Sequence, residues 1–186
     1  AIQKKCGQRK ILIVTDQDVA SFWLKTVTTS LKRNRLDFEV ACLPPGESSK
    51  SFYQLESLLN QFFEAHLARD GLILALGGGV VGDMGGFVAS TFKRGIDFIN
   101  IPTTLLSMVD ASIGGKTGVD LGSLKNQVGV INQPQMVLIF PEFLKALILR
   151  CITTSTSYIN YNYNFILKFI QFNFISINTI KGIIVR

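Results

Sequence analysis

The chain has 186 residues, of which 47% are apolar, 19 are lysine or arginine and 13 are aspartate or glutamate. This length and apolar share suit one domain with a sizeable hydrophobic core and exclude a disordered chain. Every acidic residue lies at or before Glu142, so half of the net charge of +6 falls after residue 150, and no dense basic run indicates a nucleic-acid partner.

The cysteines and the N-terminal residues are typical of a reduced, cytoplasmic protein. Cys6, Cys42 and Cys151 are odd in number and form no Cys-x-x-Cys pair, which argues against a disulfide framework and an all-cysteine zinc site. The first ten residues are polar and basic, unlike a signal peptide, and no run of about 18 apolar residues predicts a membrane span. The only histidine, His66, fits an ordinary residue of a helix.

Short apolar runs alternate with segments of helical periodicity over most of the chain. The runs predict buried strands at 11–14, 38–43, 72–76, 98–101 and 136–139, with a strand-loop-strand segment around 117–131. The helical spacing predicts helices at 19–33, 51–68, 80–92 and 104–112. This alternation predicts an α/β fold with a Rossmann-like, mainly parallel sheet and flanking helices.

From Cys151 onward the composition changes. Of these last 36 residues, 23 are isoleucine, asparagine, phenylalanine, tyrosine or lysine, without helical or strand periodicity. Because A/T-rich codons encode these five amino acids, we interpret residues 148–186 as an aberrant tail, translated out of frame or from non-coding DNA. Residues 1–147 then form an incomplete dinucleotide-binding domain. A membrane-surface segment is the less favoured alternative, since asparagine and glutamine interrupt its apolar stretches.

A glycine-rich turn, Gly77-x-Gly79-x-x-Gly82, follows a predicted strand and opens a predicted helix. Such glycines let the backbone approach a pyrophosphate, and the helix N-terminus supplies N–H groups. The turn follows the third predicted strand, whereas the usual fingerprint follows the first. Asp97 has the spacing of a ribose-binding acid, but it begins a strand and is not assigned that role. The next glycine pair, at 85–86, predicts close packing of helix on sheet.

Two other features of the sequence concern phosphate or anionic ligands. The segment 114–117 resembles the end of a P-loop, but Asp110 stands where that motif needs glycine, so an ATPase is disfavoured. Lys116, Lys125 and Asn126, with the Asp110 carboxylate, suit an anionic substrate held beside a dinucleotide. A solvated loop with capping serines and threonines remains the alternative.

An ordered series of motifs resembles the 3-dehydroquinate synthase family over residues 11–147, with bacterial members the most similar. The motifs are Leu76-Gly-Gly-Gly-Val-Val-Gly-Asp83, Phe92-Lys-Arg-Gly95, Pro102-Thr-Thr-Leu-Leu106, Val109-Asp-Ala-Ser-Ile-Gly-Gly-Lys-Thr117, Lys125-Asn126 and Gln133-Pro134. The resemblance implies an enzyme of the shikimate pathway of aromatic amino acid biosynthesis. It would convert 3-deoxy-D-arabino-heptulosonate 7-phosphate into 3-dehydroquinate and phosphate, with catalytic NAD and a divalent metal, zinc or cobalt.

The same resemblance implies roles for individual residues. Cofactor-binding positions are Asp16, Glu47 and Lys50 for the adenosine half, Gly78, Gly79, Val80 and Asp83 for the pyrophosphate and ribose, and Thr103, Thr104, Leu106, Lys116, Lys125, Phe143 and Leu147. Asp110, Lys116, Lys125 and Asn126 would face the substrate and the nicotinamide as catalytic residues. Arg94 would reach the substrate phosphate of a neighbouring subunit, which implies a homodimer.

The sequence departs from the family pattern at Asp18, Leu124 and Ala146, and the motif match stops after Leu147. The family's metal ligands, one glutamate and two histidines, belong to a helical domain beyond that point, where this chain has neither residue type. We therefore expect that domain and every metal ligand to be missing, and the chain to be inactive alone. The alternatives are a related sugar-phosphate cyclase, a metal-dependent polyol dehydrogenase, or a non-catalytic NAD-binding fragment.

Overall fold

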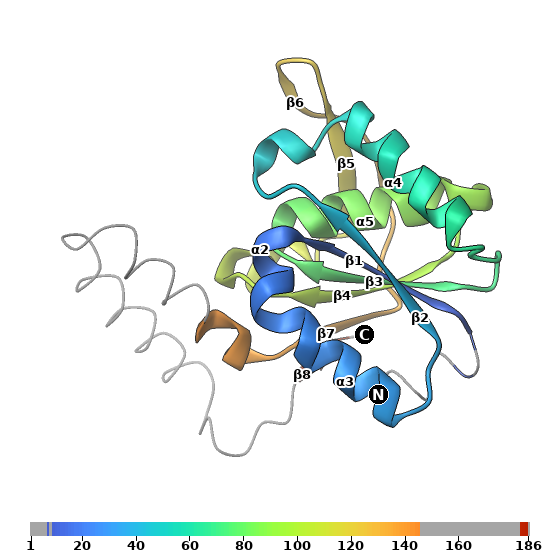
Figure 1. Ribbon diagram of the computed structural model, residues 1–186. Helices are drawn as coiled ribbons and strands as arrows, with labels where there is room; N and C mark the ends of the chain where they lie inside the picture. The colour runs from blue at the N-terminus through green and yellow to red at the C-terminus, as the bar shows by residue number, and fades with distance from the viewer. Residues whose placement is uncertain (1–6, 8, 146–182, 186) are drawn as a thin grey trace, which may run out of the picture.

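The computed structural model describes residues 7, 9–145 and 183–185 (Figure 1). Six strands form its main sheet: β1 (Ile11–Asp16), β2 (Phe38–Leu43), β3 (Leu72–Gly77), β4 (Asp97–Pro102), β7 (Met136–Ile139) and β8 (Ile183–Val185). Their order is β2-β1-β3-β4-β7-β8. The first five strands are parallel and β8 runs antiparallel to β7, which confirms the predicted mainly parallel sheet.

The order in which the chain adds parallel strands to the sheet reverses at the boundary between β1 and β3. From β1 the chain moves outward to β2, and it then returns to place β3 on the other side of β1. The strands that follow, β4 and β7, continue outward from β3. In open α/β sheets, ligands bind in the crevice beyond the carboxyl ends of the strands at such a reversal. The fold therefore points to the ends of β1 and β3 as the place of a ligand site.

The strands form where the apolar runs predicted them, because both faces of the sheet are covered. All six residues of β3 are buried, as are the first five of β1. Successive side chains of a strand point to opposite faces, so Leu12 and Val14 join one core cluster while Ile11 and Ile13 join the other. The edge strand β2 is largely exposed.

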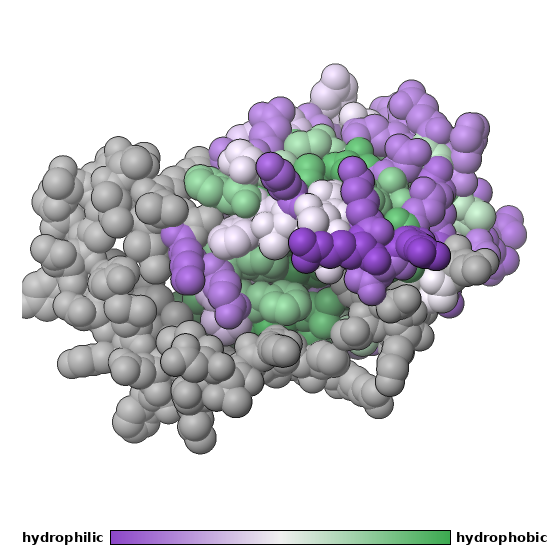
Figure 2. Space-filling view, turned by 60° about the horizontal axis from the view of Figure 1, so that its bottom comes forward, coloured by the Kyte–Doolittle hydropathy of each residue, from purple (hydrophilic) through white to green (hydrophobic). Residues whose placement is uncertain are grey.

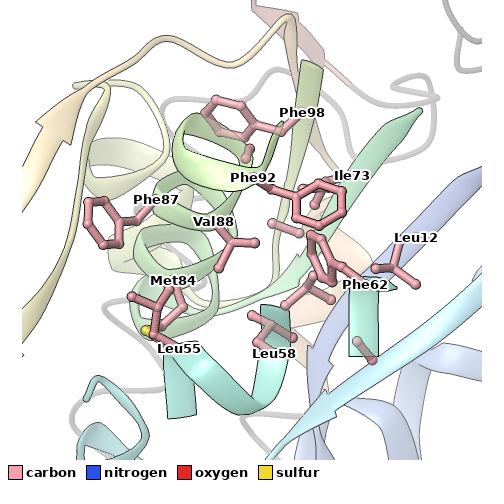
Figure 3. Close-up of a cluster of buried hydrophobic side chains, with 14 of the residues drawn as sticks. Leu12, Leu55, Leu58, Phe62, Ile73, Met84, Phe87, Val88, Phe92 and Phe98 are labelled. Carbon is pink, nitrogen blue, oxygen red and sulfur yellow. The ribbon is translucent and has the colours of Figure 1, made fainter. Parts of the chain in front are cut away.

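Helices α4 (Phe52–Glu64) and α5 (Gly79–Thr91) cover one face of the sheet (Figure 1). Their apolar side chains point toward those of β1 and β3, as Figure 3 shows for Phe62, Val88 and Ile73. The ring of Phe62 meets that of Phe92 edge to face, with centroids 5.3 Å apart. This cluster anchors α5 against the sheet and thereby fixes the glycine turn at the start of the helix.

The opposite face is covered by one helical segment made of α2 (Gln17–Val19), a wider turn η1 (Ala20–Leu24) and α3 (Lys25–Arg33). It begins two residues earlier than predicted, because an Asp16 carboxylate oxygen accepts a hydrogen bond from the Val19 amide at 2.9 Å and caps the first turn.

Figure 2 brings the lower side of Figure 1 forward. On this side, polar side chains gather in one area of the surface and apolar side chains in another.

Helix α4 ends at Glu64, four residues before the predicted end, so the prediction that His66 belongs to a helix is wrong. His66 has a φ of 50°, and its amide donates to the Phe63 carbonyl while that of Leu67 donates to the Phe62 carbonyl. This pattern is a Schellman motif, which closes a helix with a left-handed residue. Arg35 ends α3 in the same way, with a φ of 53°.

The predicted strand-loop-strand segment is a separate antiparallel hairpin of β5 (Lys116–Leu121) and β6 (Leu124–Ile131). It packs on α5, and a Cβ atom added to Gly86 would lie only 2.4 Å from Thr117 Cγ2. A Cβ on Gly85 would lie 3.0 Å from Ala75 Cβ, so the predicted close packing of this glycine pair is confirmed.

Four short helical turns complete the described residues: η2 (Glu47–Ser49), η3 (Phe92–Arg94), η4 (Ser107–Ala111) and η5 (Pro141–Phe143). Turn η4 lies within the helix predicted at 104–112. Among the described residues, no helix has both the length and the apolar character needed to cross a membrane.

Candidate functional site

The glycine turn joins the end of β3 to the start of α5, beside the β1–β3 crevice. A Cβ atom on Gly77 would lie 2.5 Å from the Cβ of Val81, so only glycine permits this tight connection. Gly78 occupies the N-cap position of α5 in an extended conformation and contributes no side-chain cap. The first amides of α5 therefore remain for an anionic ligand, at the positive end of the helix dipole.

A cavity of about 300 Å³ lies at this point, and we call it the crevice cavity. It collects residues from the ends of β1, β2, β3 and β4 and from η1 and η5. Its lining includes seven of the predicted cofactor-binding residues: Asp16, Gly78, Gly79, Val80, Thr103, Thr104 and Phe143. It also includes residues to which the sequence gave no role in binding: Asp18, Val19, Phe22, Trp23, Pro45, Gly46 and Val81.

Two polar atoms of the residues lining the crevice cavity are buried without a hydrogen-bond partner. They are the Thr103 hydroxyl oxygen and the Trp23 indole nitrogen. A buried polar group without a partner costs about 1–3 kcal/mol. The Trp23 ring packs against Phe143 with centroids 4.8 Å apart. Glycine turn, uncapped helix, aromatic wall and unsatisfied polar atoms together fit a dinucleotide such as NAD.

A second cavity, of about 560 Å³, lies beneath the β5–β6 hairpin, and we call it the hairpin cavity. Four predicted residues line it, from four different elements: Asp83 of α5, Asp110 of η4, Lys116 of β5 and Asn126 of β6. The remaining lining residues are Ala111, Gly114, Thr117, Gly118, Gln127, Gly129, Val130 and Ile131. Asp110, Lys116 and Asn126 of the predicted polar set thus line one cavity, where an ammonium group and an amide suit an anionic ligand, whereas Lys125 does not line it.

Two residues that line the hairpin cavity, Asp83 and Asn126, contact a buried lysine. The Lys50 side chain is 5% exposed, and its Nζ donates to Asp83 Oδ2 and to Asn126 Oδ1. Burial raises the pKa of the Asp83 carboxyl above its ordinary value, although the Lys50 ammonium opposes the shift; the Glu47 and Asp120 carboxylates add to it. Lys50 lines neither of the two cavities.

Other predicted residues lie away from both cavities. Lys125 and Glu47 form an exposed ion pair of 3.7 Å. Leu106 is 69% exposed. Arg94 lies beyond the far end of α5 from the glycine turn, a placement that leaves its predicted role in a neighbouring subunit open. Leu147 is outside the described residues.

Asp97 is the first residue of β4, whereas the crevice cavity lies at the carboxyl ends of the strands. Asp97 pairs with Arg9 at 2.6 Å.

The residues that the structure describes do not fit the divalent metal that the resemblance implies. In the described part of the chain, no three histidine, cysteine, aspartate or glutamate side chains come together as metal ligands. The printed sequence holds one histidine, His66, and no acidic residue after Glu142. His66 lies beyond the end of α4 and in neither cavity lining.

Comparison with known proteins agrees with this geometry. A family model described as 3-dehydroquinate synthase N-terminal matches residues 40–154, which extends past the end of the motif match. The 3-dehydroquinate synthase of Clostridium botulinum (strain Alaska E43) is 49% identical over 143 residues, which cover 77% of this chain and 41% of that protein. That of Sulfurovum sp. (strain NBC37-1) is 50% identical over 138 residues, covering 74% of this chain and 39% of that protein.

Among solved structures, ValA, a 2-epi-5-epi-valiolone synthase from Streptomyces hygroscopicus subsp. jinggangensis 5008 with NAD⁺ and Zn²⁺ bound, is similar with a TM-score of 0.70. It is 33% identical, and the match covers 74% of this chain and 38% of that one. The present chain spans 39–41% of the length of the two curated relatives. By its family match, its motifs and its fold, the chain belongs to the 3-dehydroquinate synthase family.

Proposed function

We propose that this chain is the NAD-binding portion of a 3-dehydroquinate synthase, with the dinucleotide in the crevice cavity and its pyrophosphate at the start of α5. The observation that carries the proposal is the uncapped helix that opens from Gly78 at the β1–β3 crevice. The NAD⁺ bound to the similar ValA structure supports it. The higher identity to 3-dehydroquinate synthases than to ValA favours this enzyme over a related cyclase.

Each part of the crevice cavity has a task in this proposal. The amides of Gly79 and Val80 bind the pyrophosphate, and the Thr103 hydroxyl gains the partner that it lacks. Trp23 and Phe143 shield a flat ring of the cofactor from water. When bound, NAD supplies reversible hydride transfer.

The hairpin cavity is the proposed place of the substrate, a phosphorylated sugar acid. Lys116 offers an ammonium group to a phosphate or carboxylate, Asn126 offers an amide, and Asp110 offers a carboxylate to a hydroxyl group. Because no metal fits the described residues, we propose that the 186 residues bind NAD without turnover. The homodimer, with Arg94 acting on the substrate phosphate of a neighbouring subunit, is part of the same proposal.

NAD binding is tested by fluorescence, since Trp23 is the only tryptophan and lines the crevice cavity. We expect NAD to quench Trp23, and Gly79→Ala to weaken binding about tenfold or more by holding the pyrophosphate off the helix. A Cβ at Gly79 meets nothing closer than 3.8 Å in the protein itself, so the fold tolerates the variant. Thr91→Ala, at the other end of α5, is the matched control and should bind as the wild type does. Equal affinities in both variants would contradict the proposed site.

The absence of turnover has a separate test. The purified 186-residue chain is supplied with NAD, Zn²⁺ and 3-deoxy-D-arabino-heptulosonate 7-phosphate, and phosphate release is measured. We expect none above the rate without protein. Release that depends on the chain and on NAD would show that a metal site forms in residues where we find no ligands.

A further inference from the structure

Lys50 connects three elements that are far apart in the sequence. Its ammonium group contacts Asp83 on α5 and Asn126 on β6, while its carbonyl oxygen accepts a hydrogen bond from the Asp120 amide of β5 at 2.8 Å. One residue thus fastens both strands of the hairpin to the segment that follows η2. Because its side chain is 5% exposed, this lysine is part of the protein interior and its partners are fixed.

Asn126 is held from its backbone as well. Its amide donates to Asp120 Oδ1 at 2.7 Å, and its φ of 56° lies in the left-handed region, which asparagine tolerates better than most residues. The ladder of the hairpin is irregular here, with a register shift between Val119 and Leu121. Backbone and side chain therefore place the Asn126 carboxamide at the wall of the hairpin cavity.

The chemistry of an ammonium group decides which way this carboxamide faces. Lysine has three donors and no acceptor, so only the oxygen of an asparagine amide bonds to it. With Oδ1 held by Lys50, the Nδ2 hydrogens are what remains to face the cavity. A free asparagine would offer either atom to a ligand, whereas this one offers a donor.

We propose that Lys50 is a positioning residue, whose buried ammonium group turns Asn126 into a hydrogen-bond donor for an oxyanion in the hairpin cavity. The oxyanion as ligand class rests on the proposed function, but the orientation of Asn126 does not. Lys50 acts through Asn126 and Asp83 and touches no ligand in the hairpin cavity. The charged groups around this cluster are Glu47, Asp83 and Asp120, with Asp110 and Lys116 in the same cavity lining.

The first test needs no ligand. In ¹⁵N-labelled protein, we expect the side-chain amide signals of Asn126 to move in Lys50→Met and to return toward their wild-type positions in Lys50→Arg. The double variant Lys50→Met/Asp83→Asn removes the carboxylate that Lys50→Met leaves buried and unpaired, so it folds where the single variant fails. Asn126 signals that stay at their wild-type positions in these variants would overturn the proposal.

The second test is a double-mutant cycle with inorganic phosphate as the probe, followed by the chemical shifts of residues lining the hairpin cavity. Lys50→Met and Asn126→Gly should each weaken phosphate binding about tenfold, and the combined variant should bind no worse than Asn126→Gly alone. Glycine suits the left-handed φ at position 126, so weaker phosphate binding by Asn126→Gly reflects the missing side chain and not a strained backbone. Additive losses would show that Lys50 contacts the anion directly and overturn the positioning role.

A wild-type chain without phosphate-dependent shifts in the hairpin cavity would overturn the oxyanion as ligand. Failure of the proposed function is recognised separately, because NAD would then leave Trp23 fluorescence unchanged while the Asn126 signals still respond to Lys50. The two proposals therefore succeed or fail on different measurements.

Discussion

The amide of Thr103 donates a hydrogen bond to the carbonyl oxygen of Gly77 at 2.9 Å, which ties the end of β4 to the end of β3 beside the glycine turn. The Gly77 backbone is thereby fixed, and a Cβ atom added to it would lie 2.5 Å from the Cβ of Val81. We expect Gly77→Ala to lower the free energy of unfolding by about 1–3 kcal/mol, because the added methyl group has nowhere to go. Urea unfolding measures the change.

Gly82 of α5 is the control for this prediction, since it follows Val81 directly and no atom lies within 4 Å of its added Cβ. Gly82→Ala should raise the free energy of unfolding by about 0.5–1 kcal/mol, the usual gain of alanine over glycine inside a helix. If both variants changed stability in the same direction, steric crowding at Gly77 would not be the reason for its glycine.

Replacing His66 with glycine should stabilise the protein. The Schellman motif after α4 holds this residue at a φ of 50°, where a side chain is strained and glycine is not. The expected gain is about 0.5–1 kcal/mol in the free energy of unfolding. Glu64→Gly, two positions earlier but still inside α4, should instead lose about the same amount. A loss in both variants would mean that the His66 side chain stabilises the fold through its own contacts.

Asp83 gives the stability of the protein a pH dependence of known sign. Its pKa is raised in the folded state, so the folded protein binds this proton more tightly than the unfolded chain does. Its contribution to stability therefore increases as the pH falls through the folded pKa toward the ordinary carboxyl pKa of about 4. Comparing urea unfolding of the wild type and Asp83→Asn between about pH 7 and about pH 4 isolates the effect. A wild-type advantage that shrank on acidification would refute it.

The close contact between Gly86 and Thr117 determines how the hairpin packs on α5. Gly86→Ala would force the Thr117 methyl group outward from a distance of 2.4 Å. We expect amide hydrogens of residues 116–131 to exchange faster with solvent. Those of β1 and β3 should stay as protected as the global stability of the variant allows. Uniform acceleration throughout the sheet would indicate a global loss of stability instead of a displaced hairpin.

The sequence predicted strands well and helix ends less well, for physical reasons. Strands buried on both faces read as continuous apolar runs, which is why β7 was predicted with its exact bounds and β3 to within one residue. The end of α4 was missed because histidine, and not glycine, occupies its left-handed position. The glycine fingerprint on the third strand looked unusual in the sequence, but β3 lies next to β1 at the reversal of the strand order.

The candidate site was predictable where a local motif carries it and not where distant segments meet. The glycine turn and the polar segment 102–126 supplied most of the predicted residues in both cavities. The helical spacing at 19–33 gave Trp23 no role in binding, since such spacing does not distinguish a core residue from a cavity wall. The link from Lys50 to Asn126 joins residues that no local pattern connects.

The placement of β1 between β2 and β3 has a consequence for how the protein is made. The ribosome synthesises β1 and β2 before β3, and the edge of β1 that pairs with β3 stays unpaired until α4 and then β3 have been synthesised. An apolar strand with an open edge is a template for pairing with other chains. We expect nascent chains that pause within residues 44–71 to depend on chaperones, so the speed of translation through that stretch governs how much of this protein escapes aggregation.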